Sequence, residues 1–146
     1  MKSGEMVDTI GFAIISTGRM MTKNINSVLA SLDPGITFEQ MTVLYFLSRN
    51  EEKELIQQDI AKLLNKTKSA VLRTINILEK KEYLIRTSSR EDLRKNVIQL
   101  TTQGKCIIAR IHEKFLELDL AFNNGITKEE SDKCKTVLLK LQDKCN

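Results

Sequence analysis

The sequence predicts a mainly α-helical fold with one small β-hairpin. Three observations indicate this: apolar residues recur at helical spacing along most of the chain, capping and turn residues separate these stretches, and two β-forming runs flank a charged turn. A chain of 146 residues is long enough for a real core but short for two domains, so we expect a single domain over residues 1–146.

Residues 6–32 are predicted to form one long helix that Asp33-Pro34-Gly35 ends. Its apolar stripe comprises Ile10, Ile14, Met21, Ile25, Val28 and Leu32. A second helix follows, with Thr37 as its N-cap and Gln40 as the reciprocating residue of a capping box. The polar segment NEEKEL then interrupts the helical pattern, and a short strand there is left open.

Two short helices are predicted next, separated by Asn65-Lys66-Thr67. The first covers residues 57–64, with Ile60, Leu63 and Leu64 facing inward. The second runs to about residue 81 with Thr67 as its N-cap. Its inward stripe is Val71, Ile75 and Leu78, and its opposite face carries Ser69, Leu72, Arg73 and Asn76.

Strands are predicted over residues 83–87 and 96–100, joined by a turn whose residues 90–95 are charged at five of six positions. Thr101 or Thr102 caps the next helix, which runs to about residue 122. Asn123-Asn124-Gly125 ends it, and a capping box of Thr127 and Glu130 opens a last helix to about residue 144.

The charge of the chain is uneven. Net charge is +4 overall, but residues 53–105 hold twelve Lys or Arg against six Asp or Glu, a net of +6. This concentration indicates a polyanionic partner for the middle of the chain. No apolar run is long enough for a membrane span, and three cysteines without CxxC spacing favour the reducing cytoplasm over a disulfide framework or a zinc site.

Two short helices with a tight break, the second polar and basic on its free face, match a helix-turn-helix, and the hairpin after them makes it a winged version. A helix placed in the DNA major groove presents its N-terminal residues to base edges, and its dipole favours nearby phosphate. Leu72 on that face suits a thymine methyl group. The alternative is that every amphipathic helix has such a polar face.

The segments LNKTKSAVLRTINILEKKEYLIR and SSREDLRKNVIQLTTQG resemble the MarR (multiple antibiotic resistance regulator) family over nearly the whole chain. The family's wing has an Asp-x-Arg element, here Asp92-Leu93-Arg94, followed by Leu-Thr-x-x-Gly, here residues 100–104. The resemblance implies that Arg94 enters the minor groove with Asp92 supporting it, and that Lys68, Ser69 and Arg73 belong to the recognition helix. One departure is Glu82, where the family commonly has glycine; either the backbone is strained there or the helix ends differently.

We therefore expect a winged helix-turn-helix lobe over residues 37–101, with its wing at about 83–100, and dimerisation helices from both termini, residues 6–32 and 103–146. The predicted DNA-binding residues are Lys66, Thr67, Lys68, Ser69, Leu72, Arg73, Asn76, Arg90, Asp92, Arg94 and Lys95. Arg90, Arg94 and Lys95 would neutralise phosphates or enter a narrow minor groove. A self-neutralising surface hairpin is the alternative for the wing.

The predicted function is a cytoplasmic, sequence-specific transcriptional regulator, a repressor, that binds a pseudo-palindromic DNA duplex as a homodimer. The resemblance implies release by a small aromatic or phenolic effector; the residues to inspect for its crevice are Arg19, Met20, Met21, Tyr45 and His112. No catalytic residue set, metal site or cofactor is expected, because His112 is the single histidine and no phosphate loop occurs. The alternatives are a winged-helix module that binds a protein, or a thiol-based redox sensor or enzyme; Cys106 and Cys134 are expected in the core or an interface, and Cys145 in a frayed tail.

Overall fold

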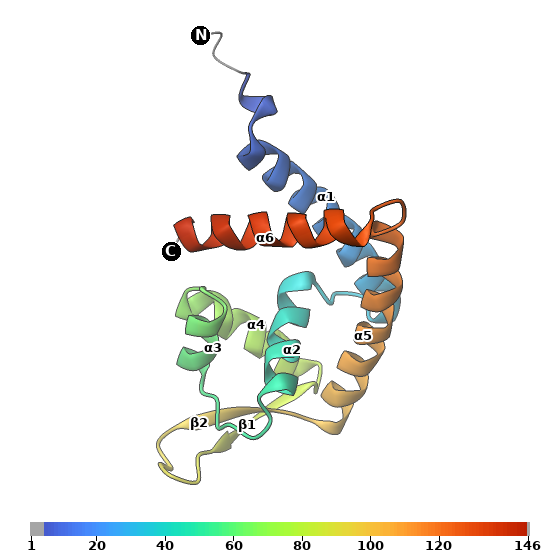
Figure 1. Ribbon diagram of the computed structural model, residues 1–146. Coiled ribbons are helices and arrows are strands. Elements are labelled where there is room, and N and C mark those ends of the chain that lie inside the picture. The colour runs from blue at the N-terminus through green and yellow to red at the C-terminus, as the bar shows by residue number, and fades with distance from the viewer. Residues whose placement is uncertain (1–4, 146) are drawn as a thin grey trace. The chain divides into compact units, whose positions relative to one another are not determined.

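The computed structural model describes residues 5–145 and has the predicted mainly helical fold with a two-stranded antiparallel hairpin (Figure 1). Its elements in order are η1 (Met6–Asp8), α1 (Ile10–Leu32), α2 (Phe38–Arg49), α3 (Gln57–Leu63), α4 (Lys68–Lys80), β1 (Leu84–Ser88), β2 (Asn96–Leu100), α5 (Thr102–Phe122) and α6 (Lys128–Cys145). The chain divides into two compact units, one ending at His112 and the other beginning at Glu113. Each unit is described by itself.

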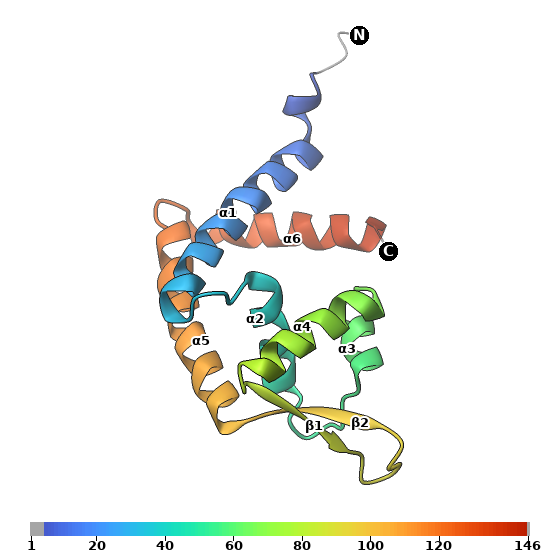
Figure 2. The ribbon, with the colours of Figure 1, turned by 180° about the vertical axis from the view of Figure 1, so that it is seen from behind.

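The long first helix begins later than predicted. The side chain of Thr9 accepts a hydrogen bond from the backbone N–H of Phe12, so Thr9 is the N-cap, and residues 6–8 form a separate 3-10 turn. Only Ile25 and Leu29 of α1 are buried, whereas Ile10 and Met21 from the predicted stripe are exposed. The first half of α1 extends beyond the other helices of its unit (Figure 2).

The core of the first unit lies among α2, α3, α4 and the hairpin, and the end of α1 and the first half of α5 add side chains to it. Its most buried side chains are Leu29, Val43, Leu44, Ile60, Ile75, Leu78, Leu84, Val97 and Ile111. The strands pair from Leu84 with Leu100 to Ser88 with Asn96. The segment before α3 adds one bridge, Ile56 with Val97, so the short strand left open from the sequence is reduced to a single pair.

The capping box predicted for α2 is only half formed. Thr37 accepts from the backbone N–H of Gln40 at 3.4 Å, as predicted. The Gln40 side chain is buried instead of reaching back, and its Oε1 atom has no hydrogen-bond partner in the part of the chain that the structure describes. Burial against the core has overridden the local capping pattern at this residue.

Left-handed residues follow both helices of the helix-turn-helix. After α3, Asn65 has φ 50°, and the backbone N–H of Lys66 donates to the carbonyl oxygen of Ala61. After α4, Glu82 has φ 60°, and the N–H of Tyr83 donates to the carbonyl oxygen of Leu78. Both ends are Schellman motifs, which satisfy the last helical carbonyl groups. The strained alternative at Glu82 is therefore the correct one.

The Leu-Thr-x-x-Gly sequence has a structural explanation. The Thr101 hydroxyl accepts from the N–H of Gly104 at 2.9 Å, which makes Thr101 the N-cap of α5, and donates to the carbonyl oxygen of Glu82 at 2.6 Å. A β-carbon at Gly104 would lie 1.9 Å from the carbonyl oxygen of Tyr83. The sequence therefore joins the start of α5 tightly to the end of α4.

The second unit contains the end of α5 and the whole of α6. The predicted capping box is present: the N–H of Glu130 donates to the Thr127 hydroxyl, and the N–H of Thr127 donates to the Glu130 carboxylate. The hydrogen bond from the Thr127 N–H, followed by one from the Thr127 hydroxyl at 2.9 Å, lowers the pKa of the Glu130 carboxyl group. Cys106 in α5 and Cys134 in α6 are exposed, so of the two predicted places the core is excluded, and a place in an interface stays a prediction. Cys145 ends α6 instead of lying in a tail beyond it.

Candidate nucleic-acid interface

The inward and outward faces of α4 are separated as the periodicity predicts. Val71, Ile75 and Leu78 are each at most 2% exposed. The outward residues Ser69, Leu72, Arg73 and Asn76 are all exposed. A polar, cationic face is thus held in place by a well-packed apolar one.

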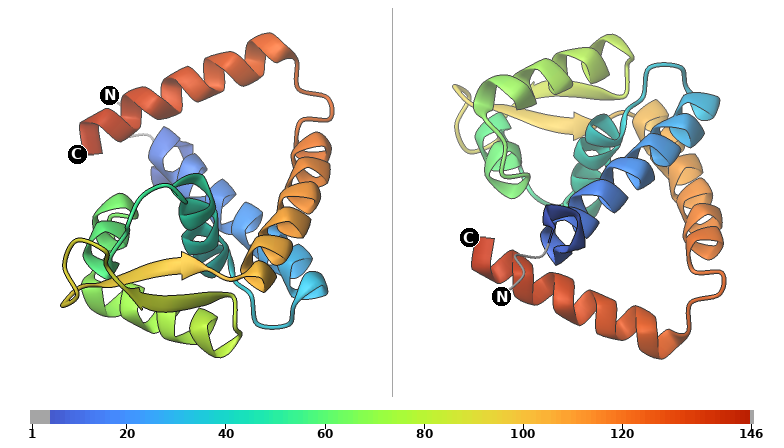
Figure 3. Two further views of the ribbon diagram at one scale, coloured as in Figure 1. Left: turned by 90° about the horizontal axis from the view of Figure 1, so that it is seen from below. Right: turned by 90° about the horizontal axis from the view of Figure 1, so that it is seen from above.

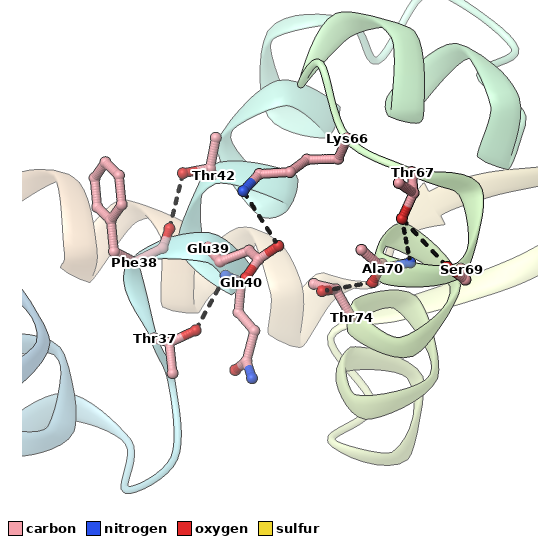
Figure 4. A network of polar contacts seen from close by, with 10 residues as sticks. All are labelled: Thr37, Phe38, Glu39, Gln40, Thr42, Lys66, Thr67, Ser69, Ala70 and Thr74. Atoms are coloured by element: carbon pink, nitrogen blue, oxygen red, sulfur yellow. Dashed lines mark hydrogen bonds and ion pairs between the residues drawn. The ribbon is translucent and has the colours of Figure 1, made fainter.

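The start of α4 is organised by Thr67, whose hydroxyl accepts from the N–H of Ala70 at 3.2 Å and lies 3.2 Å from the Ser69 hydroxyl (Figure 4). Lys66 lies just before it, with its Nζ atom 4.0 Å from a carboxylate oxygen of Glu39 on α2. That pair is half exposed on both sides and contributes little to stability. Lys68 is exposed in the first turn, and its carbonyl oxygen accepts from Gln57 Nε2 at 3.0 Å.

The far end of the α4 face is connected to the hairpin. Arg86 on β1 donates to the Asn76 side-chain oxygen at 2.6 Å and forms an ion pair with Glu79. The Asn76 oxygen, predicted to face DNA, therefore has a partner within the protein. The hydrogen bond makes Asn76 a connection between α4 and β1 as well as a residue of the exposed face.

The loop between β1 and β2 carries the predicted wing residues. Arg90, Arg94 and Lys95 are exposed and Asp92 is half-buried. Asp92 supports the loop by accepting from the backbone N–H of Arg94 at 3.0 Å. Viewed from below, this loop lies at the same end of the unit as α3 (Figure 3).

Cationic residues of α4 and of the wing converge on one hollow. A space of about 330 Å³ lies between the start of α3, the start of α4 and the end of the wing loop. Its lining includes Lys68 from α4, Lys95 from the loop, and Gln57 and Gln58 from α3. One predicted DNA-binding residue from each of two separate sequence segments, Lys68 and Lys95, thus lies at the same hollow.

Sequence reasoning missed two residues of this region, Glu54 and Ser89. The Ser89 hydroxyl donates to the Glu54 carboxylate at 2.5 Å, although the two residues lie 35 positions apart. No local pattern predicts such a pair; only the folded hairpin brings it together.

The structure also bears on two further features, a metal site and a membrane-spanning helix. Among residues 5–145, no three His, Cys, Asp or Glu side chains are grouped so that they could hold a metal ion. None of the helices in the same range combines the length and apolar character that a membrane span requires.

The chain is similar to known proteins in both sequence and structure. The MarR family model matches residues 35–95. The structure of the MepR–DNA complex from Staphylococcus aureus is 25% identical, covers 97% of this chain and 100% of MepR, and has a TM-score of 0.85. The chain belongs to the MarR family. The fold expected from the resemblance is therefore confirmed.

Two further proteins are similar to this MarR-family chain. The HTH-type transcriptional regulator PapX of Escherichia coli is 38% identical over 77 residues, which are 53% of this chain and 47% of PapX. The chain thus spans about half the length of the curated relatives it matches. The repressor CouR bound to a 23-mer DNA duplex has the same fold, with a TM-score of 0.84, 22% identity and coverage of 97% and 98%.

Members of the MarR family regulate transcription and are not enzymes, which agrees with the prediction of a non-enzymatic chain. The family match covers α2 to the wing loop, the part of the chain that carries the predicted DNA-binding residues.

Proposed function

We propose that this chain is a cytoplasmic transcriptional repressor that binds a pseudo-palindromic DNA duplex as a homodimer. The observation that carries the proposal is the joint exposure of the cationic α4 face and the wing arginines in a unit with an excess of positive charge. In a winged helix-turn-helix, α4 enters the major groove and its first turns meet base edges. Arg90 and Arg94 then bind phosphates or the narrow minor groove. MepR and CouR, which share the fold, have both been solved with DNA.

Exposed apolar residues on α1 and α6 support the homodimer. Ile10, Phe12 and Ile15 near the start of α1 are 57%, 38% and 59% exposed, and on α6 Val137 and Leu139 are 41% and 61% exposed. Side chains of this size are usually buried, so several exposed ones on α1 and α6 support an interface. A second copy of the chain would cover them and hold two α4 helices about 34 Å apart, one turn of duplex.

A hollow between α2 and α5 supports release by a small effector. Its volume is about 300 Å³, and Tyr45, Arg49, Ile108 and His112 are among its lining residues. An aromatic wall with one cation suits an aromatic or phenolic acid. An effector that binds more tightly to a form unsuited to DNA would shift the population away from the DNA-bound state.

The proposal is tested by selecting bound sequences from a random duplex pool and then titrating salt against the selected site. We expect a near-palindrome whose half-sites lie about one helical turn apart, and a steep linear fall of log affinity with log salt. A module that binds a protein would select no duplex and show a shallow salt dependence. No preference for any duplex even at low ionic strength would overturn the proposal.

A further inference from the structure

The wing loop, residues 89–95, is folded around the side chain of Ser89. This serine is only 5% exposed although it lies at the edge of the hairpin. Its hydroxyl oxygen accepts from the backbone N–H groups of Glu91 at 3.1 Å and Asp92 at 3.3 Å. The loop closes where the N–H of Ser89 donates to the carbonyl oxygen of Lys95 at 2.9 Å. The loop therefore has a defined conformation to which the Ser89 hydroxyl group contributes two hydrogen bonds from the backbone.

Glu54 lies outside the hairpin, in the segment that leads into α3, and its carboxylate binds this loop. One oxygen accepts from the Ser89 hydroxyl at 2.5 Å, and the other accepts from the backbone N–H of Arg90 at 3.1 Å. The hydrogen bond from Ser89, followed by that from Arg90, lowers the pKa of Glu54. Both carboxylate oxygens are thus used on two consecutive residues of the loop.

The same segment also contacts strand β2 of the wing. The carbonyl oxygen of Leu55 accepts from the N–H of Ile98 at 2.8 Å, and Ile56 pairs with Val97. Residues 54–56 therefore contact both the wing loop and β2 immediately before α3 begins. The orientation of the wing relative to the helix-turn-helix depends on this segment.

We infer that Glu54 is a positioning residue for the wing, holding Ser89 and Arg90 so that Arg90 and Arg94 stand at a fixed place relative to α4. The inference rests on the proposed DNA-binding function. A carboxylate on a surface that binds a polyanion weakens binding by repulsion unless it has another role. Here its charge is directed at two donors of the loop that carries the arginines, which is the arrangement a positioning role requires.

The direction in which one substitution changes DNA affinity distinguishes a positioning role from a purely electrostatic one. Glu54→Gln removes a negative charge and should raise DNA affinity if charge alone matters. If Glu54 positions the wing, the variant should instead bind its selected duplex about 5- to 30-fold more weakly, part of the loss expected for removing a wing arginine. Glu52→Gln is the matched control, because Glu52 is an exposed carboxylate with no hydrogen bond or ion pair to another residue in the described part of the chain. It should bind as well as the unmodified chain or slightly better.

A double-mutant cycle tests whether Glu54 acts through the wing. Arg94→Ala should weaken binding by a clearly smaller factor in the Glu54→Gln chain than in the unmodified chain, since residues that act as one unit are not additive. Ser89→Ala, which removes the hydroxyl and keeps the carboxylate, should weaken binding too. Its effect should also be non-additive with Glu54→Gln. Full additivity with Arg94→Ala, or binding by Glu54→Gln as tight as by Glu52→Gln, would overturn the inference.

A structural readout keeps this inference separate from the proposed function. In the unmodified chain the amides of Arg90 and Asp92 should exchange slowly with solvent, and Glu54→Gln should remove that protection while the amides of β1 keep theirs. Unchanged protection would overturn the role of Glu54 even in a chain that binds DNA. Failure of the unmodified chain to bind any duplex would overturn the proposed function instead.

Discussion

At the scale of single residues, Glu82 is a position after α4 where the backbone accepts strain. Its φ of 60° puts a side chain in the left-handed region. This conformation is maintained by the N–H groups of Glu82 and Tyr83, which donate to the carbonyl oxygens of Glu79 and Leu78, and by the Thr101 hydroxyl on the Glu82 carbonyl oxygen. A β-carbon in this conformation costs about 1–2 kcal/mol.

Replacing Glu82 by glycine should therefore stabilise the protein. Relief of the strain exceeds the entropy that glycine adds to the unfolded chain, and we expect a net gain of about 0.5–1 kcal/mol in the free energy of unfolding. Urea denaturation measures it. Asn65→Gly is the matched control at φ 50° and should gain less, because asparagine tolerates this region. A less stable Glu82→Gly protein would contradict the explanation.

Gly104→Ala should have the opposite effect. The added β-carbon would lie 1.9 Å from the carbonyl oxygen of Tyr83, which is backbone and can move only by shifting the hairpin or α5. We expect a loss of about 2–4 kcal/mol, in the range of overpacked or strained sites. The control is Gly18→Ala in α1, where nothing lies within 4 Å of the new carbon and helix propensity should stabilise the chain. Equal midpoints of urea denaturation for the two variants would refute this account of Gly104.

At the scale of elements, the end of α1 is joined to the end of α4 by a cluster of polar side chains. Lys81, the C-cap of α4, donates to both carboxylate oxygens of Asp33 at 2.9 and 3.0 Å. The Tyr83 hydroxyl donates to Asp33 at 2.6 Å. Burial raises the pKa of Asp33. Hydrogen bonds from Tyr83 and Lys81 and the charge of Lys81 together lower this pKa by more than burial raises it, so the net shift is downward. Asp33 therefore favours its charged form in the folded chain.

This cluster predicts a loss of stability at alkaline pH. Burial, and then the hydrogen bond to Asp33 and its negative charge, raise the pKa of Tyr83 from 10.0 to about 12. The contribution of the neutral phenol is fully present below pH 10.0 and is lost as the pH rises toward 12. Urea unfolding across that window should show the fall, and Tyr83→Phe should flatten it. Ultraviolet absorbance of a Tyr45→Phe protein should place the remaining phenolate transition near pH 12. A transition at the ordinary value would contradict the prediction.

Element boundaries were predictable where their signals are local. Thr37, Thr67 and Thr127 cap the helices that the sequence assigns to them, because a cap depends on residues within one turn. The capping role predicted for Gln40 was wrong because its side chain is buried in the core. The exposed face of α4 followed from periodicity alone. Glu54 and Ser89 were missed because their contact depends on the antiparallel pairing of the hairpin with a distant segment.

At the scale of the whole molecule, α1 and α6 expose apolar side chains to solvent. A second copy of the chain would cover these side chains. Light scattering should show a dimer at micromolar concentration. Leu139→Glu and Ile15→Glu should each shift it toward monomer, because a charge would be buried without a partner. Leu63→Glu is the control, because Leu63 is also exposed, at 48%, but lies on α3 and not on α1 or α6. A monomeric unmodified chain would exclude the dimer.

Substitution of two arginines should separate the roles of wing and helix. Arg94→Ala should weaken binding by about 1–3 kcal/mol for every duplex, with the fold intact and the salt slope reduced by about one. Arg73→Ala should also change the preferred bases, because α4 presents Arg73 on its outward face. Repeating the duplex selection with each protein measures both effects. Unchanged base preference in Arg73→Ala would show that the assignment of that face is wrong.

The two Schellman motifs have a consequence for how such a protein could acquire new targets. They fix where α3 and α4 stop, while Thr67 fixes where α4 starts. The start and the end of α4 therefore do not depend on the exposed side chains of Leu72 and Arg73. Substitutions at such exposed positions would change the side chains that α4 presents while the helix keeps its start and its end. A duplicated gene could therefore evolve a different DNA preference without a change of fold.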